Sequence, residues 1–462
     1  MNRPASGSSR REFLKTTGQI AAATALAGSM IPRVHAAEDN TLRIVLIGCG
    51  GRGTGAAANA MSVKRVPIKL VAMADVFPNR LASSYEQLKQ RFGEQVDVTE
   101  ERKFIGFDGY RKAMDCLRPG DIAIFATPPA FRWVHFTYAI EKNLNVFMEK
   151  PVTVDGPTSK RMFELAKKSE EKNLKVGVGL MSRHSRALQE LFKRIQDGAI
   201  GDVIFQRGYR MHGPIGYFAS TPKPEGISEL LYQVQRFHSF IWASGGCYSD
   251  FYIHIIDHLA WMKNDWPIKA IGLGGRHYKT SPEGVPYIDQ NFDVYAVEYT
   301  YPDGSKFCFD GRCMGGADNV YYSYIHGSKG SALVSASGDC GLPSRIFKGQ
   351  NPDMSALEWE SKVAPEERDP YQNEWNALVD AILDDKPHNE AERGVKTSLV
   401  TSMGRMAAHT GREITYEEIL NLSHEMAPGL DQITMDSPAP LQLGPDGRYP
   451  VPMPGLKTDR EY

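Results

Sequence analysis

Long apolar runs are scarce in this chain of 462 residues, and they occur only near its start. After a short Ala-rich segment, no run approaches the roughly 20 residues that a membrane-spanning helix needs. An excess of one charge is also missing, because 54 Lys and Arg stand against 55 Asp and Glu, with a formal net charge of -1 and no basic stripe. We therefore expect a mature chain without a membrane span and without a nucleic-acid partner.

Cysteine is sparse as well. The six cysteines form no C-x-x-C pair, and none stands beside histidine at zinc spacing, so we expect no metal site. An even count leaves disulfides open, although a chain that folds in reducing surroundings does not need them. We expect mostly buried free thiols at Cys49, Cys116, Cys247, Cys308, Cys313 and Cys340.

The N-terminus carries an export signal pattern. Arg10 and Arg11 stand in "SRREFLK", the Ala-rich run "IAAATALAGSMI" follows, and small residues at Ala36 and Ala37 suit cleavage. We interpret residues 1–36 as a twin-arginine signal peptide. This route moves proteins that are already folded, so the expected location is the periplasm or another exported compartment.

The rest of the chain divides into three parts. Residues 37–180 alternate apolar strands such as "LRIVLIG" and "IKLVAMAD" with helical stretches, which predicts a doubly wound parallel sheet of the Rossmann type. Residues 181–424 carry aromatic-rich alternating strands, which predict an α+β domain with a large, mostly antiparallel open sheet. One long helix is expected over 245–263, and later helices should pack back between the domains. Residues 425–462 form a Pro-rich, irregular tail.

A glycine-rich turn follows the first predicted strand. "GCGGRG" places Gly48, Gly50 and Gly53 in G-x-G-x-x-G register, and the next strand ends in Asp75, 22 residues after Gly53. This pattern predicts a dinucleotide site in which the backbone of the loop approaches the pyrophosphate. Because the Asp75 carboxylate accepts ribose hydroxyls and repels a 2′-phosphate, NAD is favoured over NADP, although nearby arginines weaken that argument. The expected cofactor contacts here are Gly48, Gly50, Gly51, Arg52, Gly53 and Asp75.

Two further segments carry candidate chemistry. Lys150 ends a parallel strand, where its cation can stabilise a developing alkoxide, although a surface lysine is also common there. Asp250, His254 and Asp257 fall at i, i+4 and i+7, on one face of the expected helix. We predict that Asp250 orients His254, that His254 accepts a hydroxyl proton, and that Asp257 holds a second substrate hydroxyl. His258 lies off that face and is expected to be structural.

Together these motifs resemble the glucose–fructose oxidoreductase / inositol dehydrogenase / MocA (Gfo/Idh/MocA) family over residues 42–411. The resemblance rests on the glycine loop, Asp75, "ATPP" with a later His, "EKPVTVD" and the D-x-x-x-H-x-x-D helix. It implies a Rossmann domain followed by a mostly β domain, assembled as dimers or tetramers through the open sheet face. It implies catalytic roles for Lys150, Asp250 and His254, and cofactor contacts at Thr127, Pro128, His135, Glu149 and Lys150.

The sequence also departs from the family pattern. Cys247 replaces a usual glycine, and residues 212–246 form a long insertion rich in aromatic residues and histidine. Such side chains stack on sugar rings, so Arg236, His238 and Trp242 are substrate-lid candidates; core packing explains the aromatics equally well.

The resulting hypothesis is an NAD-dependent oxidoreductase that acts on a secondary hydroxyl of a sugar, glycoside or polyol. A compartment without a free nicotinamide pool requires a tightly bound cofactor that is carried through export and regenerated in place. Two alternatives stay open. One is an NAD-dependent glycosidase that uses an oxidation–elimination–reduction cycle, a chemistry found in a family branch with a similar leader and a different helix motif. The other is a non-catalytic sugar-binding protein, against which the intact Lys150, Asp250 and His254 argue.

Overall fold

A computed structural model describes residues 40–216, 218–277, 280–281 and 283–462. The expected signal peptide over residues 1–36 lies outside the described residues. Among the residues that the structure describes, no helix is long and apolar enough to cross a bilayer.

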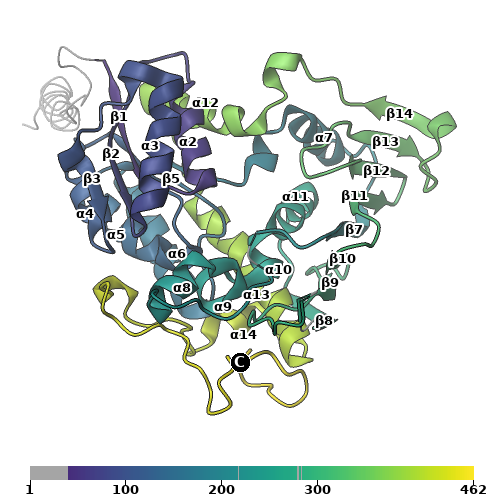
Figure 1. Cartoon of the computed structure of the whole chain (residues 1–462). Coiled ribbons are helices and arrows are strands. Elements are labelled where there is room, and N and C mark those ends of the chain that lie inside the picture. Colours follow the sequence, from purple (N-terminus) through teal and green to yellow (C-terminus); the bar gives the residue numbers. More distant parts are fainter. Residues whose placement is uncertain (1–39, 217, 278–279, 282) are drawn as a thin grey trace, which may run out of the picture. The chain divides into compact units, whose positions relative to one another are not determined.

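The first sheet has six parallel strands in the order β3-β2-β1-β4-β5-β6 (Figure 1). Its central strands are apolar and buried, as a sheet covered by helices on both faces requires. The predicted doubly wound parallel sheet is confirmed. The strands are β1 (Leu42–Ile47), β2 (Ile68–Asp75), β3 (Lys103–Ile105), β4 (Ile122–Phe125), β5 (Asn145–Met148) and β6 (Val176–Val178), and the helices between them are α2 (Gly51–Met61), α3 (Pro78–Phe92), α4 (Gly109–Met114), α5 (Arg132–Glu141) and α6 (Gly156–Glu171).

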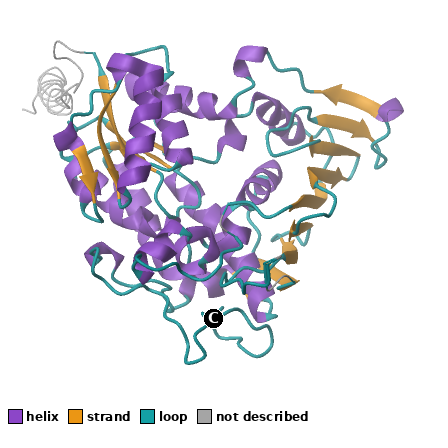
Figure 2. Cartoon of the chain, in the orientation of Figure 1, coloured by secondary structure: helices purple, strands orange, loops and turns teal. Residues whose placement is uncertain are grey.

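The second sheet has nine strands in the order β14-β13-β12-β11-β7-β10-β9-β8-β15. Every neighbouring pair is antiparallel except β7 and β10, which confirms the mostly antiparallel prediction. Burial alternates along β9 and β10, so one face packs on helices and the other stays open (Figure 2). The strands are β7 (Val203–His212), β8 (Lys269–Gly275), β9 (Val294–Thr300), β10 (Lys306–Cys313), β11 (Val320–Gly327), β12 (Gly330–Ser335), β13 (Arg345–Lys348), β14 (Leu357–Glu360) and β15 (Ile414–Thr415).

Helices from the second half of the chain join the two sheets. In α12 (Pro370–Leu383), Trp375 is fully buried and stacks on Phe147 of β5, with ring centroids 4.5 Å apart. The long α13 (Ala391–Thr410) contacts both α6 and β8. The remaining helices of this half are α7 (Arg186–Gln196), α8 (Glu229–Gln235), α9 (Ile241–Ser244), α10 (Gly246–Asp250), α11 (Ile253–Lys263) and α14 (Tyr416–Asn421).

The single helix predicted over 245–263 is wrong, because the structure breaks it into α10 and α11. Phe251 and Tyr252 form the break. There, the carbonyl of Asp250 accepts a hydrogen bond from Lys150 Nζ, and the carbonyl of Phe251 accepts one from Arg210 Nη1. Since cationic side chains satisfy these carbonyls, the chain turns without leaving buried acceptors unpaired.

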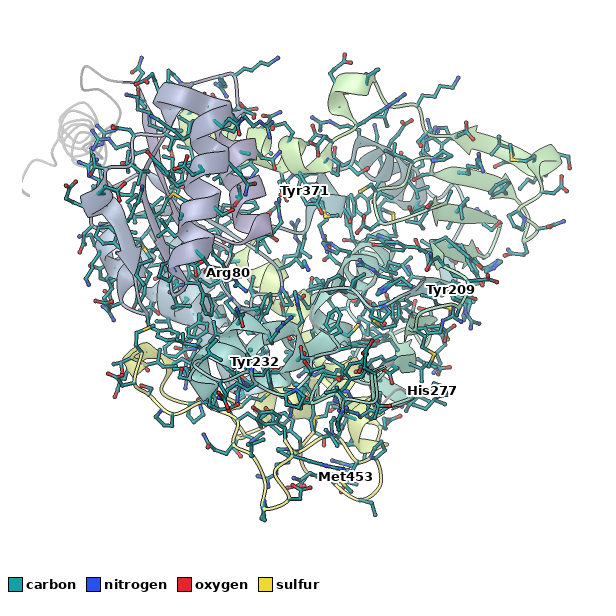
Figure 3. The ribbon with its side chains drawn as sticks, viewed as in Figure 1. Arg80, Tyr209, Tyr232, His277, Tyr371 and Met453 are labelled. Carbon is teal, nitrogen blue, oxygen red and sulfur yellow. The ribbon has the colours of Figure 1, made fainter. Side chains whose placement is uncertain are left out.

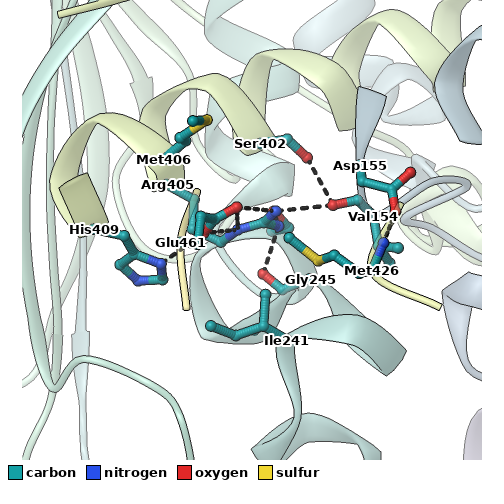
Figure 4. A network of polar contacts seen from close by, with 12 residues as sticks. Val154, Asp155, Ile241, Gly245, Ser402, Arg405, Met406, His409, Met426 and Glu461 are labelled. Carbon is teal, nitrogen blue, oxygen red and sulfur yellow. Dashed lines mark hydrogen bonds and ion pairs between the residues drawn. The ribbon is translucent and has the colours of Figure 1, made fainter. Parts of the chain in front are cut away.

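The C-terminal tail is irregular apart from one short turn, Leu430–Gln432, and it is anchored at its end. Glu461 is buried and accepts hydrogen bonds from Arg405 and His409 of α13 (Figure 4). Arg405 also donates to the carbonyls of Val154 and Gly245, so one guanidinium links the tail, α13 and both halves of the chain.

Candidate active site

The glycine-rich turn has the geometry of a phosphate-binding loop. Gly48 has φ +95°, and a Cβ atom there would lie 2.6 Å from the backbone of Ala126. A Cβ at Gly53 would lie 2.0 Å from the Gly48 carbonyl oxygen, so α2 packs closely on β1. At Gly50 and Gly51 nothing lies within 4 Å of such an atom. The loop is therefore tight where it packs and open where a pyrophosphate would sit at the N-terminus of α2.

A cavity of about 550 Å³ runs along this edge of the parallel sheet. It begins at the turn between β1 and α2, passes the end of β2, and ends between β4 and the segment around residue 237. Its size suits a small ligand or cofactor. Among the predicted cofactor contacts, the lining includes Gly48, Gly50, Gly51, Arg52, Gly53, Asp75, Thr127, Pro128 and His135, and it adds Arg80, Phe237 and His238.

Asp75 lies at the end of β2, and the backbone holds its carboxylate in place. Oδ2 accepts a hydrogen bond from the N–H of Cys49 at 2.7 Å, and Oδ1 accepts one from the N–H of Phe77 at 2.8 Å. Burial raises the pKa of Asp75, and these backbone donors oppose that rise. Each oxygen keeps a lone pair for a ribose hydroxyl, as the sequence pattern requires.

A buried polar cluster supports the other end of the cavity. Arg132 donates from Nε to the carbonyl of Glu149 at 2.9 Å and from Nη1 to the hydroxyl of Thr127 at 2.8 Å. His135 Nδ1 lies 3.3 Å from the same hydroxyl, and burial lowers the pKa of His135 to about 3. A neutral His135 and an anchored Thr127 thus form a rigid wall beside Pro128, where a nicotinamide ring would lie.

Glu149 takes a different position from the one that the resemblance implied. It does not line the cavity; its carboxylate accepts Arg52 Nε at 2.5 Å. Arg52 Nη2 also lies 3.4 Å from Glu374 of α12. Two buried carboxylates therefore fix the Arg52 cation next to the glycine loop, and Glu149 reaches the cofactor site only through Arg52.

Lys150, Asp250 and His238 meet beside the cavity. Lys150 Nζ lies 3.6 Å from Asp250 Oδ1, and His238 Nε2 lies 3.2 Å from Asp250 Oδ2. Burial raises the pKa of Asp250, but Lys150 and His238 outweigh it and bring the value to about 2. Lys150 and Asp250 do not line the cavity themselves, so this cluster borders it through His238.

The structure corrects the proposed pairing within the Asp–His–Asp motif. Asp250 holds Lys150 and His238 and not His254; His254 Nδ1 instead faces Asp339 Oδ2 at 4.0 Å. The break between α10 and α11 turns Asp250 and His254 apart, although both remain near Lys150. Burial lowers the pKa of His254 to about 3, so its imidazole is neutral at neutral pH.

Asp257 does not present a free carboxylate to a substrate. Its two oxygens accept Arg183 Nε and Nη2 at 2.8 and 2.9 Å, and Thr397 donates to Oδ1 at 2.8 Å. The side chain is fully buried. The predicted role in holding a substrate hydroxyl is therefore wrong; Asp257 anchors α11 to its neighbours.

The lid candidates separate in the structure. Trp242 is fully buried, and its Nε1 donates to Gln233 at 2.8 Å, so it is a core residue. Arg236 ends α8 and does not line the cavity, whereas His238 does. His258 Nε2 lies 2.8 Å from the hydroxyl of Ser323 on β11, in agreement with its expected structural position.

Some site residues escaped the sequence reasoning. Asp339 and Glu374 lie far along the chain from the motifs, and no local pattern marks them. Arg132 stands in a helical stretch where its charge predicts a surface position, yet it is 1% exposed. Arg132 is identified as a site residue only by its buried contacts with Thr127 and Glu149.

Comparison with known proteins agrees with this geometry. Residues 42–180 match the GFO_IDH_MocA family, an oxidoreductase family with an NAD-binding Rossmann fold. This segment is thus similar to the NAD-binding domain of that family. An inositol 2-dehydrogenase of Corynebacterium glutamicum is 29% identical over 96 residues, which are 21% of this chain and 28% of that protein. The chain thus matches little more than a quarter of this relative's length.

Solved structures extend the likeness of the fold to the second domain of this chain. Aldose–aldose oxidoreductase from Caulobacter crescentus aligns with a TM-score of 0.59 at 17% identity, over 81% of this chain and 99% of that one. Myo-inositol 2-dehydrogenase from Lactobacillus plantarum aligns with a TM-score of 0.58 at 22% identity, over 81% of this chain and 99% of that one. A levoglucosan dehydrogenase in complex with NADH and levoglucosan aligns with a TM-score of 0.61 at 17% identity, over 81% of this chain and 99% of that one. At these identities the likeness establishes the fold.

Proposed function

We propose that this chain is an NAD-dependent oxidoreductase that oxidises a secondary hydroxyl of a sugar or polyol. The observation that carries the proposal is the cluster of Lys150, Asp250 and His238 beside a cavity that the glycine loop and Asp75 line. The relatives named above act on inositols, aldoses and levoglucosan, which are all polyhydroxylated rings or their open forms. A sugar or polyol is therefore the substrate class that we propose here.

The residues of the cavity fit NAD. The open backbone from Gly48 to Gly53 would hold the pyrophosphate, Asp75 the adenosine ribose, and Thr127 with Pro128 the nicotinamide side. When bound, the nicotinamide supplies a hydride acceptor. Because Asp75 repels a 2′-phosphate, we propose NAD and not NADP.

The chain's own residues then handle the proton and the charge. Lys150 Nζ donates a hydrogen bond to the substrate hydroxyl oxygen and stabilises the alkoxide that develops as C–H breaks. Asp250 keeps Lys150 in place through their ion pair. His254 is neutral and takes the hydroxyl proton, which completes the oxidation to a ketone.

We further propose that the cofactor is tightly bound. Val234, Phe237 and His238 of the insertion line the cavity, and Arg80 Nη2 donates a hydrogen bond to the carbonyl of Gln235 at 3.2 Å. Arg80 is labelled in Figure 3. The tail holds the insertion from behind, since Gln233 donates to the carbonyl of Leu441 at 2.8 Å. Exchange of the cofactor would require this part of the insertion to move.

We also propose export by the twin-arginine route, from Arg10 and Arg11, because a cofactor that stays bound can be carried through that route. A variant with both arginines replaced by lysine is expected to stay in the cytoplasm.

We also propose a homodimer or homotetramer formed through the open face of the nine-stranded sheet. Tyr209, Tyr322 and Tyr324 cluster there, and the centroids of Tyr209 and Tyr322 lie 4.9 Å apart (Tyr209 is labelled in Figure 3). Leu273 of β8 is 68% exposed on this face. Half-buried tyrosines and an exposed leucine on one open sheet face suit an association surface. Light scattering should give a mass that is a multiple of the protomer mass.

Lys150→Met tests the oxidoreductase proposal. With inositols and aldoses as substrates, the variant should lose about 10²-fold or more in turnover because the alkoxide loses its cation. Lys142→Met is the matched control, since that lysine pairs with Asp115 on the surface. Unchanged turnover in the Lys150 variant would remove it from the mechanism. Release of an aglycone with solvent deuterium in the sugar would point to the glycosidase cycle instead.

A further inference from the structure

The imidazole of His254 has an unmatched atom. Nδ1 is buried and has no hydrogen-bond partner within the described chain. A buried ring nitrogen in this condition is costly unless a nearby group compensates it. The carboxylate of Asp339 lies 4.0 Å from this atom, while Asp250, four residues before His254, is bound to Lys150 and His238.

Asp339 is fixed so that its carboxylate points inward. It lies between β12 and β13 and follows Gly338, which has φ +87°. Tyr321 of β11 donates its hydroxyl to Oδ2 at 2.7 Å, and Cys340 Sγ donates to Oδ1 at 3.2 Å. The Arg210 guanidinium lies 4.6 Å from the centroid of the Tyr321 ring and holds that ring in position.

The other acid near His254 is already committed. Asp257 forms its bidentate pair with Arg183. No Lys or Arg among the described residues forms an ion pair with Asp339. Burial raises the pKa of Asp339, but His254, Tyr321 and Arg210 outweigh it, so the carboxylate is charged at neutral pH. A charged acid beside an unmatched imidazole nitrogen is the arrangement that selects one tautomer.

We propose that Asp339 is the positioning residue of His254: it keeps the proton on Nδ1 and leaves Nε2 as the atom that accepts the substrate proton. As Nε2 takes this proton, the ring becomes an imidazolium, and its attraction to the Asp339 carboxylate grows. The 4.0 Å gap closes by a small ring rotation or is bridged by water, as in active sites that tighten when substrate binds. The inference rests on the proposed function, because it assigns the chemistry of the same histidine.

Three charged groups besides Asp339 bear on the pKa of His254. Lys150 and Arg210 lower its pKa, Asp257 raises it, and burial lowers it most. The Asp339 carboxylate raises it. Removing that charge should therefore lower the pKa of His254 further, and the acid limb of the kcat profile should move to lower pH.

The test is Asp339→Asn in the full chain, with Asp353→Asn as the matched control. Asp353 lies in an exposed loop of the same domain and bonds only locally, to Ser355. We expect kcat to fall about 10²-fold, KM to change less than about 3-fold, and the acid limb to shift downward, as loss of an oriented base requires. Asp339→Glu should recover part of kcat. An unchanged kcat and pH profile would overturn the proposal.

A second readout does not depend on turnover. ¹⁵N-histidine NMR of the full chain, with the His254 signals assigned by their loss in His254→Gln, reports which ring nitrogen carries the proton. We expect the Nδ1–H tautomer in the wild type and a shift toward Nε2–H in Asp339→Asn. If that variant does not fold, Tyr321→Phe removes a donor to Asp339 and should give a smaller shift in the same direction. A wild-type Nε2–H tautomer would contradict the role of Asp339, whereas absent sugar oxidation with the expected tautomers would contradict only the proposed function.

Discussion

The proposed preference for NAD over NADP rests on the position of one carboxylate. Asp75 is held by the N–H groups of Cys49 and Phe77, so its charge cannot turn away from the ribose. A 2′-phosphate would meet this charge directly. Arg80 also lines the cavity, and it would face such a phosphate if the carboxylate were removed.

Asp75→Asn should therefore raise the affinity for NADP relative to NAD by about 10-fold or more, since one buried charge interaction is worth about 1.4 kcal/mol or more. Binding constants for both dinucleotides, from calorimetry on protein stripped of cofactor, measure this ratio. Asp97→Asn, an exposed position shortly after α3, should leave the ratio unchanged. A ratio that does not move in Asp75→Asn would contradict the assignment of Asp75 to the ribose.

Among individual site residues, those that directly follow a parallel strand could be predicted from the sequence. The glycine loop, Asp75, Thr127 and Pro128 come directly after parallel strands, and the structure brings them to one cavity. The sequence could not predict which side chains pair with each other in the site. Asp250 pairs with His238, and His254 faces Asp339, because tertiary packing brings together residues that no local spacing relates.

Two glycines on the inner face of the nine-stranded sheet place the helices that carry the site. A Cβ at Gly311 of β10 would lie 2.3 Å from the Tyr252 ring, and one at Gly208 of β7 would lie 2.3 Å from Ile255. These contacts let α10 and α11 lie directly on the sheet. Tyr252 is two residues before His254, so the packing of its ring sets the position of the histidine.

Gly311→Ala is expected to lower the free energy of unfolding by about 1–3 kcal/mol, the usual cost of overpacking, and to reduce turnover by moving α11. Gly275→Ala is the control, because a Cβ at that strand end meets nothing within 4 Å. Chemical denaturation and kcat report the two effects. Equal stability of both variants would show that Tyr252 adapts and that the sheet does not position the helix.

Element types followed from sequence periodicity, but one boundary did not. One helix was predicted over the residues that form α10 and α11, and helical spacing predicted a common face for Asp250 and His254. The break depends on Lys150 and Arg210, which bind the carbonyls of Asp250 and Phe251 from other elements. Such long-range donors leave no trace in local periodicity.

A buried charge network at the C-terminus joins distant segments of the described chain. Arg405 is fully buried among Glu461, Ser249 and the carbonyls of Val154 and Gly245 (Figure 4). Burial raises the pKa of Glu461, but Arg405 and His409 outweigh it and lower the value to about 2. Because this carboxyl has a folded pKa below its unfolded value, its contribution to stability is complete above about pH 4.5 and is lost as the pH falls toward 2.

Glu461→Ala should thus lower the free energy of unfolding by about 3 kcal/mol at pH 7, because it leaves the Arg405 cation buried and unpaired. The loss should shrink in acid, where the wild-type carboxyl is protonated too. Glu413→Ala removes a surface partner of Lys269 and should cost about 1 kcal/mol or less. If Glu461→Ala is as stable as Glu413→Ala, the tail is not an integral part of the fold.

The most direct measurement of the central claim is the cofactor content of the purified protein and its reduction by a sugar. We predict about one equivalent of NAD(H) in the supernatant after denaturation. In the folded protein we predict absorbance at 340 nm that rises when inositols or aldoses are added and stays flat in Lys150→Met. A protein that carries no dinucleotide and binds added NAD(H) only at millimolar concentrations would contradict the proposed function, because the assigned residues either hold that cofactor or act on a substrate beside it.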